Sequence, residues 1–234
     1  GAAMKKVLIF SFLTIFAAQA SFAQTAYTEK RQVSGFDEVA FAVSGEVLIN
    51  LGKDYSVELE GDRDYIKEII TEVDGDELKI RRDKWFDSGN KKVIVRITMP
   101  ALDGISVSGS GRLTVNDPLR GNELDVAISG SGKAILRDVA LGEVECAISG
   151  SGSLNIAGNG TIKKLEISIS GSGDYMGDGT RIDVLDARIS GSGSCDCHVT
   201  EMLRASISGS GNINYSGDPK IDASVSGSGK VRMK

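Results

Sequence analysis

The sequence predicts an all-β fold, a right-handed parallel β-helix built from coils of 18–21 residues. The tetrapeptide Ser-Gly-Ser-Gly occurs seven times, at steps of 21, 20, 21, 20, 18 and 18 residues. Apolar and polar residues alternate on both sides of each copy. A fixed period of this length is typical of a solenoid, in which each repeat buries its apolar face only against its neighbours. The right hand follows from the general rule for parallel crossovers. The absence of a six-residue repeat argues against a left-handed hexapeptide helix.

Each repeat contains two alternating runs and a looser third stretch. Residues 124–128 read Leu-Asp-Val-Ala-Ile before one motif, and residues 134–136 read Ala-Ile-Leu after it. Alternation of apolar and polar residues with a period of two indicates a strand with one buried face. The third stretch is rich in Gly, Asn, Asp and Pro, which is turn chemistry. Single apolar residues there are expected to fill the core, namely Leu119, Leu141, Ile162 and Ile182.

The alternation continues through the motif itself. If Ile128 points inward, Ser129 and Ser131 point outward, and Gly130 and Gly132 point inward at a tight bend. Stacked coils then place the serines in two outward ladders. The candidate ladder residues are Ser108, Ser110, Ser129, Ser131, Ser149, Ser151, Ser170, Ser172, Ser190, Ser192, Ser208 and Ser210. Hydroxyl rows can bind a repetitive ligand such as a glycan; alternatively, they are small corner residues that satisfy local backbone groups.

Residues 24–100 predict an irregular N-terminal cap of strands and one short helix, ahead of the repeat region at 101–234. We expect the helix over about 64–73, capped by Asp62 or Asp64. Strands are expected at 77–80 and 93–99. Terminal repeats of solenoids are atypical because they cover an exposed edge. Trp85 is either a rim residue that packs on the cap or an exposed aromatic binding platform.

Residues 1–23 predict a signal peptide. Lys5 and Lys6 precede an apolar stretch at 7–18 that is too short to span a bilayer, and Ser-Phe-Ala at 21–23 is a small-residue cleavage site. The Gly-Ala-Ala ahead of Met4 is interpreted as a cloning remnant. Removal of this segment takes two lysines from 27 basic residues and leaves 32 acidic ones, so the mature chain carries a net charge of −7. We therefore expect no nucleic-acid partner and no later membrane insertion.

The motif Cys195-Asp-Cys197-His198 is the one pattern that resembles a metal or redox site. Both cysteines align with core positions of other repeats, as Cys146 does, and free cysteine is a good small core residue. His198 is expected to point outward, away from both thiols, so the ligands do not converge as zinc requires. We expect neither a metal site nor a cofactor.

Carboxylates recur at outward repeat positions, and these are Asp125, Glu145, Glu166 and Asp186. Pectin-cleaving enzymes also use carboxylates on a β-helix face, but this is fold analogy alone. Because no coil departs from the repeat, we expect no catalytic residues and no enzyme. Residues 174–179 (Asp-Tyr-Met-Gly-Asp-Gly) lack the spacing of a calcium loop and predict a turn.

The strand expected at 231–233 is the last segment, with no capping helix after it. Open strand edges pair with other chains. A homo-oligomer formed through terminal strand edges is therefore expected, although Lys230, Arg232 and Lys234 would weaken it.

The chain resembles the head GIN domain family of auto-transporter adhesins, which is widespread in Bacteroidetes. The resemblance rests on the export signal, the opening Val-Ser-Gly-Phe-Asp-Glu-Val at 33–39, the repeated Ile-Ser-Gly-Ser-Gly and the Gly-Asn-Ile-Asn at 211–214. It implies an exported β-helix that acts in adhesion without catalytic residues. The chain departs from typical autotransporters because we find no translocator segment after the repeats. Export to the cell surface or the periplasm of a Gram-negative bacterium is therefore expected.

Three functions remain open at this point. The first is a non-enzymatic adhesin or envelope-binding module with an unknown glycan or protein ligand. The second is a self-associating structural protein of the periplasm or envelope. The third is a polysaccharide-active enzyme.

Overall fold

The computed structural model describes residues 26–83 and 91–234, and it is built almost wholly of strands. The predicted signal peptide and Trp85 lie outside the described residues. The elements are β1 (Tyr27–Arg31), β2 (Glu38–Phe41), β3 (Gly45–Leu51), β4 (Ser56–Gly61), α1 (Arg63–Lys67), β5 (Ile69–Asp74), β6 (Glu77–Arg82), β7 (Val93–Met99), β8 (Gly104–Val107), β9 (Arg112–Val115), β10 (Leu119–Gly130), β11 (Lys133–Leu136), β12 (Val139–Gly150), β13 (Ser153–Ile156), β14 (Thr161–Gly171), β15 (Asp174–Gly191), β16 (Ser194–Gly209), β17 (Asn212–Ser216), β18 (Lys220–Gly227) and β19 (Lys230–Met233).

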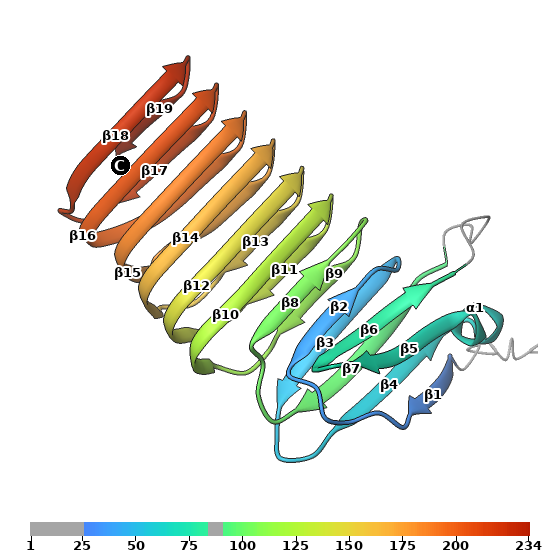
Figure 1. Ribbon diagram of the computed structural model, residues 1–234. Coiled ribbons are helices and arrows are strands. Elements are labelled where there is room, and N and C mark those ends of the chain that lie inside the picture. Colours follow the sequence, from blue (N-terminus) through green and yellow to red (C-terminus); the bar gives the residue numbers. More distant parts are fainter. Residues whose placement is uncertain (1–25, 84–90) are drawn as a thin grey trace, which may run out of the picture.

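Strand pairing produces two long rows that wrap one core, and this is the predicted parallel β-helix (Figure 1). Row A runs β5-β6-β2-β8-β10-β12-β14-β15-β16-β18. Row B runs β1-β4-β7-β3-β9-β11-β13-β15-β16-β17-β19. Pairing is parallel except at β1, β4 and β5, which lie at the N-terminal end.

The order of the stack differs from the order of the sequence at this end. The coil formed by β2 and β3 lies between the coil of β6 and β7 and that of β8 and β9 (Figure 1). Early and late segments therefore meet where the cap joins the repeats.

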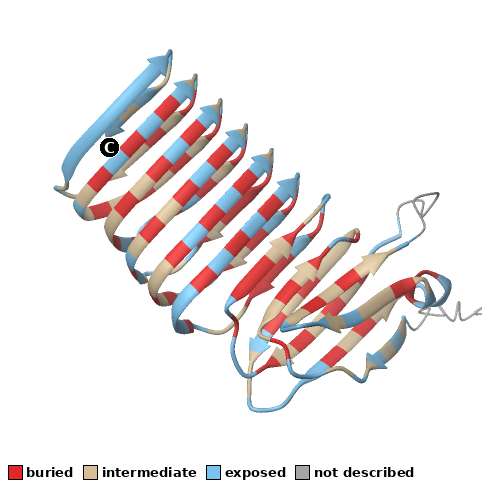
Figure 2. Ribbon diagram, viewed as in Figure 1, coloured by how far each residue is buried: buried red, intermediate tan, exposed pale blue. Residues whose placement is uncertain are grey.

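The core is a continuous column of apolar side chains inside the two rows. Buried and exposed residues alternate along the strands until β18, which is exposed along its whole length (Figure 2). The predicted third-side fillers are buried: Leu119, Leu141, Ile162 and Ile182 are at most 4% exposed. Each fully buried aliphatic side chain contributes about 1.5–3 kcal/mol relative to exposure. Stacked coils supply this burial, whereas an isolated coil leaves its core faces open.

The two glycines of each motif have different roles, which corrects the expectation that both point inward. The first glycine adopts a positive φ, for example 113° at Gly171, and it is half-buried or exposed. The second is buried in every motif but the last, where Gly229 is half-buried, and at Gly132 a Cβ would lie 2.7 Å from a methyl carbon of Val107. The left-handed backbone at the first position turns the chain, so the simple in-and-out alternation does not hold there.

The helix is shorter than predicted. Asp62 is its N-cap, as expected, and its carboxylate accepts hydrogen bonds from the backbone N–H groups of Asp64 and Tyr65. After Lys67 the chain enters β5, which forms a hairpin with β6 around a two-residue loop at Gly75 and Asp76. The β-branched residues of 69–73 favour a strand, and the Gly-Asp pair at 75–76, with Gly75 at a positive φ, favours a two-residue hairpin turn.

Residues 174–179 also differ from the prediction. They belong to β15, which runs continuously from Asp174 to Gly191, and they do not form a separate turn. No helix in the described part of the chain is long and apolar enough to cross a membrane.

Candidate functional site

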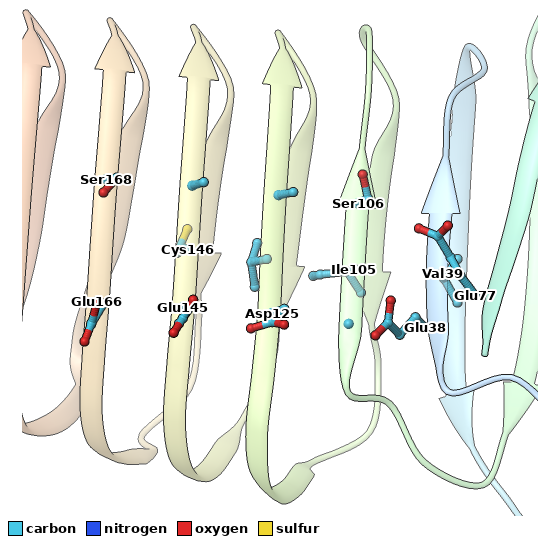
Figure 3. A pocket seen from close by; sticks show the side chains of 14 residues that line it. Glu38, Val39, Glu77, Ile105, Ser106, Asp125, Glu145, Cys146, Glu166 and Ser168 are labelled. Carbon is cyan, nitrogen blue, oxygen red and sulfur yellow. The ribbon is translucent and has the colours of Figure 1, made fainter. Parts of the chain in front are cut away.

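A column of carboxylates on the outside of row A forms the candidate site (Figure 3). The strand register places neighbouring residues of this column directly beside one another. In order along the row, the column is Glu77, Glu38, Gly104, Asp125, Glu145, Glu166, Asp186, Arg204 and Asp222. A groove of about 410 Å³ covers the part from Glu77 to Glu166, with Val126 and Cys146 among the residues that line it.

Gly104 is the one position without a side chain in the grooved part of this column. A Cβ there would lie 2.9 Å from the Cγ and Cδ atoms of Glu38. Glycine therefore gives Glu38 the space to lie across β8. This brings a carboxylate of the cap toward Asp125, the first carboxylate of the repeats.

The carboxylates of the column differ in how they are compensated. The Nζ atom of Lys164 lies 2.6 Å from Oε1 of Glu166, and the Nζ atom of Lys79 lies 3.6 Å from Oε2 of Glu77. Glu38, Asp125 and Glu145 have no ion pair among the described residues. Like charges on neighbouring strands destabilise a sheet. The centre of the groove is thus an uncompensated negative surface.

Two carboxyl groups at this junction have raised pKa values. Burial is the main cause at Glu38, and the nearby carboxylates of Asp76, Glu77, Asp37 and Asp125 raise its pKa further. Burial and the charge of Asp37 raise the pKa of Asp103. Burial disfavours the ionised form of both groups, and the neighbouring carboxylates further disfavour negative charge at this end of the groove.

Oxygen ligands also converge beside the groove. Carboxylate oxygens of Asp37, Glu38 and Asp76 lie within 4.8 Å of one another, and no other metal-type cluster occurs in the described residues. Three such ligands are fewer than the six to eight that calcium takes. The cysteines are placed as predicted: Cys146, Cys195 and Cys197 are free and buried in the core. His198 bonds through Nδ1 to the Ser216 hydroxyl, at 2.9 Å, on the outer side of its strand.

The serine positions form the predicted rows along the corner between rows A and B. Ser108 is half-buried, and the other ladder serines are exposed. Register pairs the first serines in the order Ser129, Ser149, Ser170, Ser190, Ser208 and Ser226. The second row is tied by backbone hydrogen bonds, such as 2.8 Å from Ser151 N–H to the Gly130 carbonyl oxygen. Among the described residues, no ladder hydroxyl bonds to protein.

Sequence reasoning found three of the five carboxylates that line the groove. It identified Asp125, Glu145 and Glu166 as outward residues, but treated them as an ordinary solvated face. It missed that Glu38 and Glu77 extend the same column from the cap. The signal was available for Glu38, which precedes Val39 as Asp125 precedes Val126. Nothing in the sequence places Glu77 there, because β6 joins the row out of sequence order.

The fold and the site define a β-solenoid protein with charged ladders and grooves on its lateral faces. The chain belongs to the family described as "Putative auto-transporter adhesin, head GIN domain", whose profile matches residues 35–219. The resemblance inferred from the sequence is thereby confirmed. No curated protein matches the chain.

Several solved structures share the fold. A putative adhesin from Bacteroides fragilis is 23% identical with a TM-score of 0.83, and the match covers 91% of this chain and 98% of that one. A putative adhesin from Parabacteroides merdae is 23% identical with a TM-score of 0.73, covering 91% and 97%. A protein from Parabacteroides distasonis described as a "Putative lipid binding protein" is 24% identical with a TM-score of 0.72, covering 91% and 98%.

Proposed function

We propose that this protein is an exported, non-enzymatic binding protein of the adhesin type, and that the acidic groove of row A holds a cationic partner. The uncompensated run of Glu38, Asp125 and Glu145 carries the proposal. A groove lined by one sign of charge concentrates ligands of the opposite sign. Membership of an adhesin-named family supports the class of function.

Binding of the mature chain to an array of glycans and matrix proteins tests the proposal. The array includes chitosan oligomers and lysine-rich polypeptides as cationic members. The double variant Asp125→Asn/Glu145→Gln should lose binding to cationic members, and added salt should weaken the binding of the native chain. The matched control is Glu123→Gln/Asp218→Asn, which changes exposed carboxylates outside the groove. Equal loss in the control, or no cationic ligand, would contradict the proposal.

The location of the protein is tested separately. Protease treatment of intact cells should remove the mature chain while a periplasmic control survives, if the solenoid is displayed on the surface. Protection until the outer membrane is opened would favour a role inside the envelope.

A second candidate function is self-association through the last coil, and the exposure of core-type residues favours it. Ile221, Val225 and Met233 are 47%, 42% and 63% exposed, although the residues beside the first two in the preceding coil, Leu203 and Ile207, are buried. Within residues 26–83 and 91–234, β18 pairs only with β16 and β19 only with β17. Sedimentation over a range of concentrations should show assembly that Val225→Lys removes. A monomer at all concentrations would exclude this candidate.

The enzyme hypothesis has a direct test. Release of reducing ends or unsaturated products from a polysaccharide panel would replace the binding proposal, whereas binding without turnover would agree with it.

A further inference from the structure

A second groove, of opposite charge, lies on the row B side of the same junction. It has a volume of about 730 Å³ and is formed by β3, β4 and β7 of the cap together with β9, β11 and the corner of the first coils. Lysine and arginine side chains and serine hydroxyls line it. The residues that matter to the argument are Lys92, Arg112, Lys133, Ser44, Ser110 and Ser131.

The positive charge of this groove is only partly neutralised by the protein. Lys92, Arg112 and Lys133 are exposed and have no carboxylate partner among the described residues. The other charges of the lining are largely accounted for, since Lys91 pairs with Asp62 at 3.0 Å and Glu60 pairs with Arg96 outside the groove. Glu46 is the remaining carboxylate of the lining.

Lys133 is the cation of this groove whose placement beside a like charge is least compensated by its strand neighbours. In the strand register, Arg112 on β9 lies between Glu46 on β3 and Lys133 on β11, so Glu46 offsets part of its charge, whereas Lys133 lies between Arg112 and Ser153. Like charges directly opposite one another destabilise neighbouring strands. Further along the same column the polar residues are bonded instead, as where the Ser194 hydroxyl donates to Asp174 at 2.5 Å. An anion bound between Arg112 and Lys133 would relieve the repulsion.

The shape and polarity of the groove narrow the class of anion. The cations come from strands that are spaced about 4.8 Å apart. An extended ligand with several charges contacts all of them, whereas a single small anion does not. Among the described residues, the hydroxyls of Ser44, Ser110 and Ser131 have no hydrogen-bond partner, so they can bond to the hydroxyls of a sugar. Val93 is buried and Ile94 half-buried, so these side chains offer little apolar surface to a lipid.

We propose that this basic groove binds an acidic polysaccharide, with Arg112 and Lys133 holding its anionic groups and Ser110 and Ser131 bonding to its sugar hydroxyls. A guanidinium group matches a carboxylate or a sulfate through paired hydrogen bonds. In this proposal the ladder serines that bind a ligand are Ser110 and Ser131, which belong to the first coils. The other ladder serines do not line this groove.

Binding of the mature chain to polygalacturonate, dextran sulfate and neutral dextran tests this proposal. The native chain should bind one or both acidic polymers, and the two polymers distinguish carboxylate from sulfate recognition. Arg112→Gln/Lys133→Gln should weaken binding by about tenfold or more. The matched control Lys163→Gln/Arg204→Gln removes two exposed cations outside the groove and should change binding less than about twofold. Glu46→Gln should strengthen binding, because it removes a carboxylate from the lining.

Several outcomes would overturn the proposal. These are the absence of binding to either acidic polymer, equal binding to neutral dextran, or equal loss in the control variant. Binding to phosphatidylglycerol vesicles in place of the polymers would assign the groove to a membrane surface. Loss of self-association in Arg112→Gln/Lys133→Gln without polymer binding would assign it to a second copy of this chain. Because Asp125 and Glu145 lie outside this groove, their variants should leave polymer binding intact, and the two proposals can fail independently.

Discussion

The repeating coils and the N-terminal cap solve different problems. In the repeats, each column carries similar residues from coil to coil, so the outer faces are regular. In the cap, β6–β7 and β2–β3 stack out of sequence order and antiparallel strands cover the end. Both grooves lie where the two regions meet. Repetition builds a rigid and regular surface, and the interruption of the repetition creates hollows in it.

Charge compensation shows the same difference. Within the repeats, Lys164 pairs with both Glu143 and Glu166, and Arg188 pairs with Asp186 at 3.3 Å. At the junction, Glu38 on one side and Arg112 on the other have no ion pair among the described residues. Like charges therefore gather where the regular pattern is interrupted, and there the protein has the most to gain from a ligand.

The largest expected loss of stability comes from replacing the first glycine of a Ser-Gly-Ser-Gly motif that lies inside the stack of coils. Gly171 has a φ of 113°, and a Cβ there would lie 2.6 Å from the carbonyl oxygen of Gly150 in the preceding coil. Gly171→Ala should lower the free energy of unfolding by about 3 kcal/mol, because backbone strain and overpacking act together. Chemical denaturation followed by circular dichroism measures the change.

Gly109 provides the matched variant at the junction. It is the first glycine of the first motif and has a φ of 78°, but apart from its chain neighbours no atom of the described residues lies within 4 Å of the site of its Cβ. Gly109→Ala should cost only the strain of the left-handed backbone, about 1–2 kcal/mol. Equal losses at the two positions would show that stacking contacts do not restrict the motif.

The next effect is a gain of stability in the core of the repeats. The Tyr175 hydroxyl is buried and has no hydrogen-bond partner among the described residues, and burial raises its pKa, so the group stays protonated. An unsatisfied buried donor costs about 1–3 kcal/mol. Tyr175→Phe should therefore raise the free energy of unfolding by about 1 kcal/mol. A decrease in denaturation midpoint would show that the hydroxyl is satisfied in solution.

The sequence predicted the regular region well and the junction poorly, for a physical reason. Alternation and a fixed period determine which residues of a coil face inward, and so Cys146, Leu141 and Ile182 were placed correctly from the pattern alone. The cap depends on contacts between segments far apart in the chain. A helix over 64–73 was wrong beyond Lys67, because pairing with β6 favours a strand there. The grooves were not predicted because Glu77 and Lys92 reach them only through the stacking of the cap.

The smallest expected effect tests the charge of the junction directly. Glu38 has a raised pKa in the folded protein, mainly through burial and then through the surrounding carboxylates. The folded state therefore binds this proton more tightly than the unfolded state. Its contribution to stability is complete at a pH below the unfolded pKa, about 4.3, and is lost as the pH rises through the folded value.

Glu38→Gln should remove this loss. The variant should be more stable than the native chain at pH 7, within about 0.5 kcal/mol, and the gain should vanish near pH 4. Thermal melting at both pH values measures the difference, with Glu123→Gln as an exposed control outside the groove. A gain that persisted at pH 4 would come from packing across Gly104 and not from charge. A loss at pH 7 would mean that the carboxylate makes a favourable interaction that outweighs the repulsion, and the acidic groove would then be a stabilising feature of the junction in its own right.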